Sequence, residues 1–165
     1  MSDSIKVDHY MGTGTFFVSV QAKATKTTYR GQFKVKCLLS ALDYINSDAY
    51  FRELLGKTNP EYANEYVTQL CYTYSQLRYR VMEAPDWFSQ DSNGTPGGAL
   101  EDNVLTEILD QCVKVEEKYR TEMEAKYEKA KGTVKKAIDD GELNNGEEKV
   151  KEEDQEWLKN SKRLQ

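Results

Sequence analysis

Apolar and polar residues alternate over two stretches in the first quarter of the chain, 15–25 and 29–39. A period of two residues is typical of a strand that buries one face. The residues expected to face the core are Phe16, Val18, Val20, Ala22, Ala24, Phe33, Val35 and Cys37. Residues 26–28 are expected to turn the chain, so the pattern predicts an antiparallel hairpin. Such a hairpin needs helices or a partner's strand beside it to be stable.

Further along the chain the period changes to three and four residues, which predicts helices. The first helix begins at Ser40, with Asp43 three residues later in a capping-box arrangement, and ends at Gly56. The apolar stripe expected to face the core consists of Leu42, Ile45, Ala49, Leu54 and Leu55.

The second predicted helix has the clearest start, period and stop, and we expect it to be the centre of the core. Asn59 is expected to cap it, Pro60 suits its first position, and Ala84-Pro85 is expected to end it. Its buried face is predicted to consist of Ala63, Tyr66, Val67, Leu70, Tyr74, Leu77 and Val81.

A loop rich in Ser, Gly and Pro is predicted at 89–100, followed by a third helix that begins near Asp102. The apolar stripe of this helix contains Val104, Leu105, Ile108, Leu109, Cys112, Val115, Tyr119 and Met123, and it thins after Tyr119.

Together these elements predict a mostly helical α+β fold in three parts. They are a flexible N-terminal arm at 1–14, a globular domain of hairpin and helices at 15–112, and a charged helical extension at 113–165. The extension holds 13 Lys or Arg and 14 Asp or Glu in 53 residues. From about Lys131 onward it has too little apolar surface to offset the entropy of ordering, so we expect it to fray when alone.

Charge and cysteine content narrow the functional classes. The net charge of −5 and the pI near 5.1 argue against nucleic acid as a partner. Cys37, Cys71 and Cys112 are far apart in apolar surroundings, which favours free buried thiols of an intracellular protein. No 18-residue apolar segment occurs, so no membrane association is expected.

No pattern of residues indicates catalysis. His9 is the single histidine and lies in the predicted arm, where an imidazole is not held in place. The glycine-rich stretch 94–98 lacks the Lys-Ser/Thr of a phosphate-binding loop. We therefore expect no enzyme, no catalytic residue, no metal site and no cofactor.

Tyrosine is abundant, with 11 residues in the chain, five of them on the second predicted helix. Either a wide core holds them or part of that helix binds another protein, because tyrosine is enriched in interfaces. The candidate partner-binding residues are Tyr66, Tyr72, Tyr79, Trp87, Phe88, Trp157 and Leu158. For Trp87 and Phe88, an inward-facing hydrophobic plug is the favoured interpretation.

Short motifs over residues 29–120 suggest a family. The matching residues are Gly31, Phe33 and Val35 in YRGQFKVK, Leu77, Val81, Glu83, Ala84, Pro85 and Trp87 in LRYRVMEAPDWF, and Glu116, Tyr119 and Arg120. Their order resembles that of the tail assembly chaperones of long-tailed bacteriophages. The strand at 15–25 and the charged tail are not part of that pattern.

The resemblance implies a chaperone that binds the tape measure protein and the tail-tube protein in the host cell cytoplasm, without cofactor or catalysis. A structural virion component of a neck, tail or head, joining neighbouring virion subunits, is the alternative, and homo-oligomerisation is left open. A second alternative, an acidic regulatory or nucleic-acid-associated protein, rests only on the mixed-charge tail.

Overall fold

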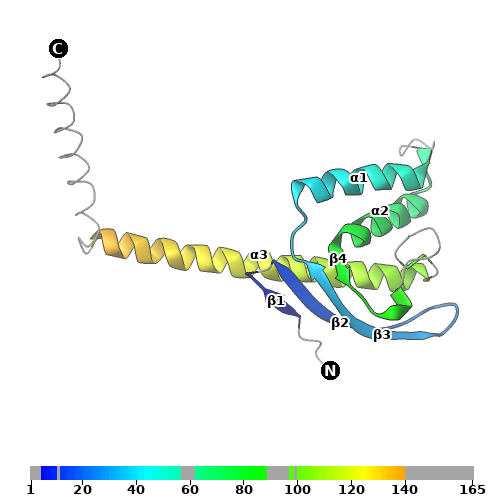
Figure 1. Cartoon of the computed structure of the whole chain (residues 1–165), viewed down its shortest axis with the longest axis horizontal. Helices are drawn as coiled ribbons and strands as arrows, with labels where there is room; N and C mark the ends of the chain where they lie inside the picture. The colour runs from blue at the N-terminus through cyan, green and yellow to red at the C-terminus, as the bar shows by residue number, and fades with distance from the viewer. Residues whose placement is uncertain (1–4, 11, 57–61, 89–96, 99, 140–165) are drawn as a thin grey trace, which may run out of the picture. The chain divides into compact units, whose positions relative to one another are not determined.

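In the residues that the structure describes, a four-stranded antiparallel sheet is combined with three long helices, as predicted for a mostly helical α+β fold (Figure 1). The computed structural model describes residues 5–10, 12–56, 62–88, 97–98 and 100–139, with 134–139 described by their backbone alone. The described elements are β1 (Lys6–Asp8), β2 (Thr13–Gln21), β3 (Thr28–Lys36), α1 (Ala41–Leu55), α2 (Glu65–Arg80), β4 (Val81–Glu83), a 3₁₀ turn (Asp86–Phe88) and α3 (Asp102–Asp139).

The predicted hairpin is confirmed as β2 and β3, which pair along their whole length. Phe16 lies opposite Phe33, and their rings stack with centroids 5.4 Å apart. Between the strands, Lys26 adopts a left-handed conformation with φ of 59°. The inward residues are buried as expected, except that Val20 is only partly buried and Ala24 lies past the end of β2 and is exposed.

Part of the predicted N-terminal arm is a strand. β1 pairs with β2, with Val7 opposite Gly14, because the free edge of β2 offers backbone hydrogen-bonding groups to this polar segment. The Lys118 ammonium also donates to the carbonyl oxygen of Ile5 at 2.6 Å. The ring of His9 stacks on Tyr119 with centroids 5.4 Å apart. His9 is therefore held against α3 and is not in a loose arm.

α2 ends earlier than predicted, at Arg80 rather than at Ala84-Pro85. Residues Val81–Glu83 form β4, which pairs antiparallel with β3. The Lys34 ammonium and the Glu83 carboxylate lie 2.9 Å apart across this pair. The open edge of β3 gives the backbone of Val81–Glu83 partners that a further turn of helix would otherwise supply.

α3, and not α2, is the centre of the core. The inward stripe of α3 is buried against the sheet, and its members are Val104, Leu105, Ile108, Leu109, Cys112 and Val115. On α2 only Leu77 of the predicted face is fully buried, while Tyr66 and Val67 are exposed. Asn64 caps α2 by accepting a hydrogen bond from the Tyr66 backbone N–H at 2.9 Å. The predicted cap at Asn59 lies outside the described residues.

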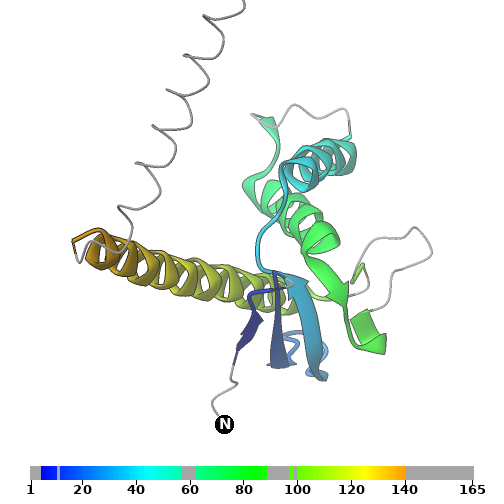
Figure 2. The ribbon, with the colours of Figure 1, turned by 60° about the vertical axis from the view of Figure 1, so that its left-hand side comes forward.

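The predicted ends of α1 are confirmed, but of its predicted apolar stripe only Leu55 is buried. Ser40 and Asp43 form the capping box, and Gly56 follows the last turn with φ of 64°. Leu42 and Ile45 are 64% and 65% exposed, whereas Ser47, on the opposite side of the helix, is buried. α1 packs beside α2, as both views show (Figures 1 and 2). A polar contact on that side, described below, explains the reversal.

The turn between β2 and β3 is tied to the start of α3 by a carboxylate. Glu101 accepts hydrogen bonds from the backbone N–H groups of Ala24 (2.7 Å) and Thr25 (2.8 Å) and from the Thr25 hydroxyl (2.8 Å). Asn103 adds two bonds, accepting from the N–H of Lys23 and donating to the carbonyl of Gln21. The hairpin is thereby fixed on α3 at both its apolar face and its turn.

The chain divides into two units, Met1–Arg120 and Thr121–Gln165. The first contains the sheet, α1, α2 and the buried part of α3, and the described part of the second is the remainder of α3. Sequence alone placed this division at 112–113. It falls later because Val115 is fully buried and belongs to the core.

Candidate protein-binding surface

Two of the motifs quoted above, YRGQFKVK and LRYRVMEAPDWF, meet in one contact between β3 and the segment that follows β4. The indole N–H of Trp87 donates to the carbonyl oxygen of Arg30 at 2.8 Å, and its ring lies edge-on to Phe33 with centroids 5.6 Å apart. Gly31 leaves the space that Pro85 fills, since a Cβ at this position would overlap the proline ring. The spacing of these motif residues is thus explained by packing between β3 and the segment that follows β4.

A chain of polar side chains connects the three helices inside the first unit. The Gln76 amide donates to the Ser47 hydroxyl at 3.1 Å and accepts from the Arg80 Nε at 3.2 Å. Arg80 Nη1 lies 2.8 Å from Glu116 Oε2, as an ion pair without full hydrogen-bond alignment. Arg120 Nη2 donates to the other oxygen of Glu116 at 2.6 Å.

This series of polar contacts fixes how α1 and α2 are oriented. Burial alone acts to raise the pKa of Glu116, but the guanidinium groups of Arg120 and Arg80 outweigh it and hold the pKa below its ordinary value of 4.5. A buried charge without its partner is costly, so Arg80 must stay against Glu116. α2 consequently turns its polar side inward, and α1 follows through Ser47.

Three apolar residues in the first half of α1 are left facing solvent as a result. Leu42, Ile45 and Ala49 are exposed and follow one another at helical spacing. We call these three residues the α1 apolar face. Near the start of α2, Tyr62, Tyr66 and Val67 are exposed by 83%, 57% and 45%. These exposed apolar side chains make α1 and the start of α2 the candidate protein-binding surface.

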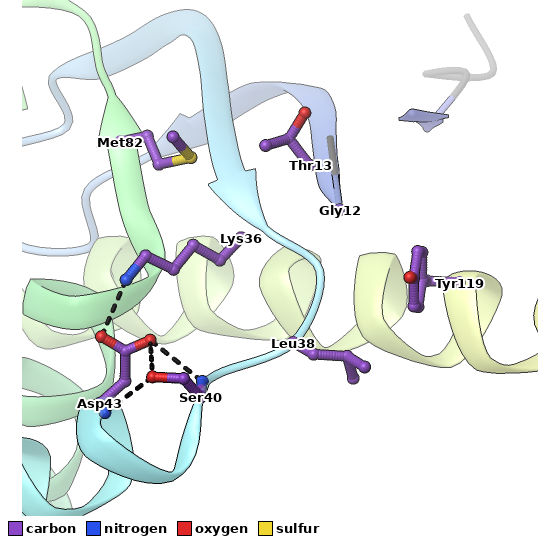
Figure 3. Close-up of a pocket in the computed structure, with 8 residues that line it drawn as sticks. All are labelled: Gly12, Thr13, Lys36, Leu38, Ser40, Asp43, Met82 and Tyr119. Carbon is purple, nitrogen blue, oxygen red and sulfur yellow. Dashed lines mark hydrogen bonds and ion pairs between the residues drawn. The ribbon is translucent and has the colours of Figure 1, made fainter. Parts of the chain in front are cut away.

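An open pocket of about 470 Å³ lies where the start of β2 and the end of β3 meet the start of α1 (Figure 3). It is lined by Gly12, Thr13, Lys36, Leu38, Ser40, Asp43, Met82 and Tyr119. Lys36 pairs with Asp43 at 2.8 Å, and this hydrogen bond holds the pKa of the carboxyl below its usual value. Asp43 is further bound by Ser40. The charged groups thus satisfy one another, while Leu38 and Met82 remain 39% and 50% exposed.

The predicted partner-binding residues are placed differently from one another. Tyr66 and Tyr72 are exposed, by 57% and 47%, and Tyr79 is half-buried. Phe88 is buried in the core and Trp87 is half-buried against it, so the plug interpretation is confirmed for this pair. Trp157 and Leu158 lie outside the described residues.

The sequence interpretation missed the α1 apolar face as a surface, although it had identified the stripe. The sequence does contain a signal for it in the polar residues Ser47, Gln76 and Arg80. Because of them, α1 and α2 each have a polar side as well as an apolar side that could face the core. Met82 was also missed, because it was taken as part of a longer helix. In β4 its side chain points to the pocket side of the sheet (Figure 3).

Cys71 and Cys112 are both buried thiols. Burial raises the pKa of the Cys112 thiol to about 12, and burial likewise raises that of Cys71. A thiol of that kind is a poor nucleophile at neutral pH. Within the described ranges, no cluster of three His, Cys, Asp or Glu side chains is placed to hold a metal ion. What the described surface does present is a set of exposed apolar side chains.

None of the helices in the described ranges is long and apolar enough to cross a membrane. No protein-family model, curated protein or solved structure matches the chain.

Proposed function

We propose that the protein is a non-enzymatic bacteriophage assembly protein, a tail assembly chaperone that binds the tape measure protein and the tail-tube subunits. It acts in the host cell cytoplasm while the tail is built. It keeps long apolar helices of its client soluble by covering them.

The observation that carries the proposal is the α1 apolar face. Leu42 and Ile45 are each nearly two-thirds exposed on a well-capped helix. Burying such a side chain is worth about 1.5–3 kcal/mol. A helical client with its own apolar stripe can be held this way, as in other complexes of an amphipathic helix with an apolar surface.

The positions of the motif residues give a second support. Gly31, Pro85 and Trp87 share one contact, and Glu116 and Arg120 share an ion pair. Motif residues that are far apart in the sequence therefore contact each other in the fold. This shared packing is the support that the motif residues give to the proposal.

Co-expression with the tape measure protein of the same genome tests the proposal. The double substitution Leu42→Ser with Ile45→Ser should leave folding intact, because both side chains are exposed, and should reduce co-purification at least about tenfold. Val113→Ser is the matched control, since Val113 is a 41% exposed aliphatic residue on α3. It should co-purify the client like the unaltered protein.

Two results would contradict the proposal. The first is equal recovery of the client with the double variant and the control. The second is stoichiometric amounts of the protein in finished virions by mass spectrometry, which would identify it as a structural virion component instead.

A further inference from the structure

The outer edge of β2, on the side of β1, is covered at its two ends and open between them. β1 pairs with β2 only over residues 13–15 (Figure 1). At the far end, the Asn103 side chain donates to the carbonyl oxygen of Gln21 at 3.0 Å and accepts from the N–H of Lys23 at 3.2 Å. A neighbouring strand would make hydrogen bonds of the same kind. Residues 17–21 lie between these two covered ends.

The backbone groups of β2 point alternately toward β3 and away from it. The N–H of Ala22 donates to Thr27, and the carbonyl of Gly12 accepts from Cys37, both on the side of β3. The β2–β3 pairing has no register shift between these points, so residues with even numbers face β3 and those with odd numbers face outward. We call the outward groups that have no partner among the described residues the open edge of β2: the N–H and C=O of Phe17 and Ser19 and the N–H of Gln21.

Nothing in the sequence of this stretch blocks the addition of a strand. Phe17 is 43% exposed and Ser19 is exposed, so solvent reaches the edge. Proteins usually protect a sheet edge with a charged side chain, a proline or a bulge, and residues 17–21 contain none of these. A row of alternating N–H and C=O groups is matched by another extended backbone and not by an apolar helix.

One side of α3 runs beside the open edge and determines which side chains fit there. Asn103 contacts β2, and Lys118, further along α3, donates to the carbonyl of Ile5 at 2.6 Å. Glu107 and Gln111 lie between them at helical spacing and are half-buried. The Gln111 amide donates to Glu107 Oε1 at 2.9 Å. The carboxylate of Glu107 is therefore a negative charge beside the open edge.

We propose that the open edge of β2 binds an extended segment of another protein, which adds a strand antiparallel to β2 and in line with β1. Phe16 and Val18 are buried in the core, so Phe17 lies on the face away from α3. Directly opposite residues share a face. Residues of the segment opposite Phe17 and Ser19 should therefore be apolar and cover the Phe17 ring. Those between them face α3, where Lys or Arg would meet Glu107.

Two other occupants fit less well. Every antiparallel register of a second copy of β2 that clears β1 brings Gln21 into the pairing, and Asn103 already occupies its carbonyl oxygen. The chain's own residues before β1 have the wrong charge. In the register of β1, where Val7 lies opposite Gly14, Asp3 would share the side of Glu107, and like charges disfavour that place.

Titration of the full chain with a peptide, followed by NMR of the backbone amides, tests the proposal. The probe is Thr-Lys-Val-Lys-Val-Lys-Thr, acetylated and amidated at its ends. The amide signals of Phe17, Ser19 and Gln21 should shift, because their N–H groups gain acceptors. Those of Val18 and Val20, which face β3, should shift less.

Two N-methylated forms of the peptide show whether its backbone is recognised. The valines lie on the face of Phe17, so their N–H groups point at β2. Methylation of both should weaken binding at least about tenfold, because hydrogen bonds to the open edge are lost. Methylation of the two central-flanking lysine nitrogens is the matched control, since these point away from β2. It should leave binding unchanged.

Glu107→Lys tests the charge of the segment. This variant should bind the lysine peptide about fivefold or more weakly, and should bind Thr-Glu-Val-Glu-Val-Glu-Thr more tightly than the unaltered protein does. Glu53→Lys makes the same change of charge at an exposed position on α1 and is the matched control. It should bind both peptides like the unaltered protein.

Four results would overturn the proposal. They are unchanged amide signals at Phe17, Ser19 and Gln21 at every peptide concentration, equal binding of the two N-methylated peptides, and an unchanged peptide preference of Glu107→Lys. The fourth is binding that occurs only in a chain lacking residues 1–4, which would show that the chain's own arm fills the edge. The proposal does not depend on the chaperone function.

Discussion

At Gly31 the packing of a neighbouring segment requires the absence of a side chain. The Pro85 ring occupies the space a Cβ would need, and the Trp87 indole nitrogen lies close by. Trp87 in turn binds the carbonyl of Arg30 and contacts Phe33. One small residue thus allows the segment after β4 to close over β3.

Gly31→Ala should destabilise the protein by about 1–3 kcal/mol, because the inserted methyl group displaces Pro85 in a packed contact. Chemical denaturation followed by tryptophan fluorescence would measure the loss. Gly132→Ala is the matched substitution in an open position, where nothing lies within 4 Å of the added Cβ. It should increase helix content without lowering stability. Equal stability of the Gly31→Ala variant and the unaltered protein would contradict the packing account.

Some residue-scale features were predictable and others were not. The capping box of Ser40 and Asp43 is local, so its spacing in the sequence was sufficient to predict it. The pairing of Arg80 with Glu116 joins positions 36 residues apart, and each looks like an ordinary surface charge on its own helix. No periodicity shows that such charges are buried, because their burial depends on the partner.

At the scale of elements, the β2–β3 turn depends on Glu101 at the start of α3. Hydrogen bonds from the backbone N–H groups of Ala24 and Thr25 hold the pKa of Glu101 below its usual value of 4.5. These bonds favour the charged carboxylate. The helix start and the hairpin turn are therefore joined most tightly when Glu101 is ionised.

The stabilisation by Glu101 should depend on pH. A carboxyl whose pKa is lowered by folding stabilises the protein fully above its unfolded pKa, and the effect is lost as pH falls through the lower folded value. The unaltered protein should melt at a higher temperature than Glu101→Gln at pH 7. The difference should shrink as the pH falls below about 4.5. Glu116 titrates in both proteins, so the comparison isolates Glu101. A difference that does not change with pH would show that ionisation of Glu101 is not involved.

The sequence predicted the elements better than their inward faces. Both strands of the hairpin, the start and end of α1 and the stripe of α3 up to Val115 lie where the pattern placed them. Met123, predicted as the last member of that stripe, is 41% exposed. For α1 the pattern was amphipathic, but the buried side is the polar one that carries Ser47. β4 was hidden because Val81–Glu83 continues the helical spacing of α2. A strand of three residues forms there because β3 has a free edge beside it.

At the scale of the whole molecule, α3 has two roles that its sequence separates only gradually. Up to Val115 it supplies core residues, and Glu116 pairs with Arg80. Beyond Arg120 it belongs to the second unit, where Met123 and Tyr127 are exposed. The change in composition near residue 112 marks the first charged turns. It precedes the last fully buried residue, Val115, by about one turn, because Val115 and Glu116 are flanked by charged residues that face outward.

Truncation distinguishes these two boundaries. A chain ending after Lys131 keeps every residue of the core cluster, so its melting temperature should stay within about 2 °C of the full chain. A chain ending after Cys112 loses the buried Val115 and leaves Arg80 without Glu116. It should lose at least about 3–5 kcal/mol, because an uncompensated buried charge and a missing core side chain act together. Calorimetry of both chains at equal low concentration gives the comparison. If the shorter chain melts like the full protein, the core ends at residue 112 and the ion pair contributes nothing. If the longer one melts far below it, residues after Lys131 pack on the first unit.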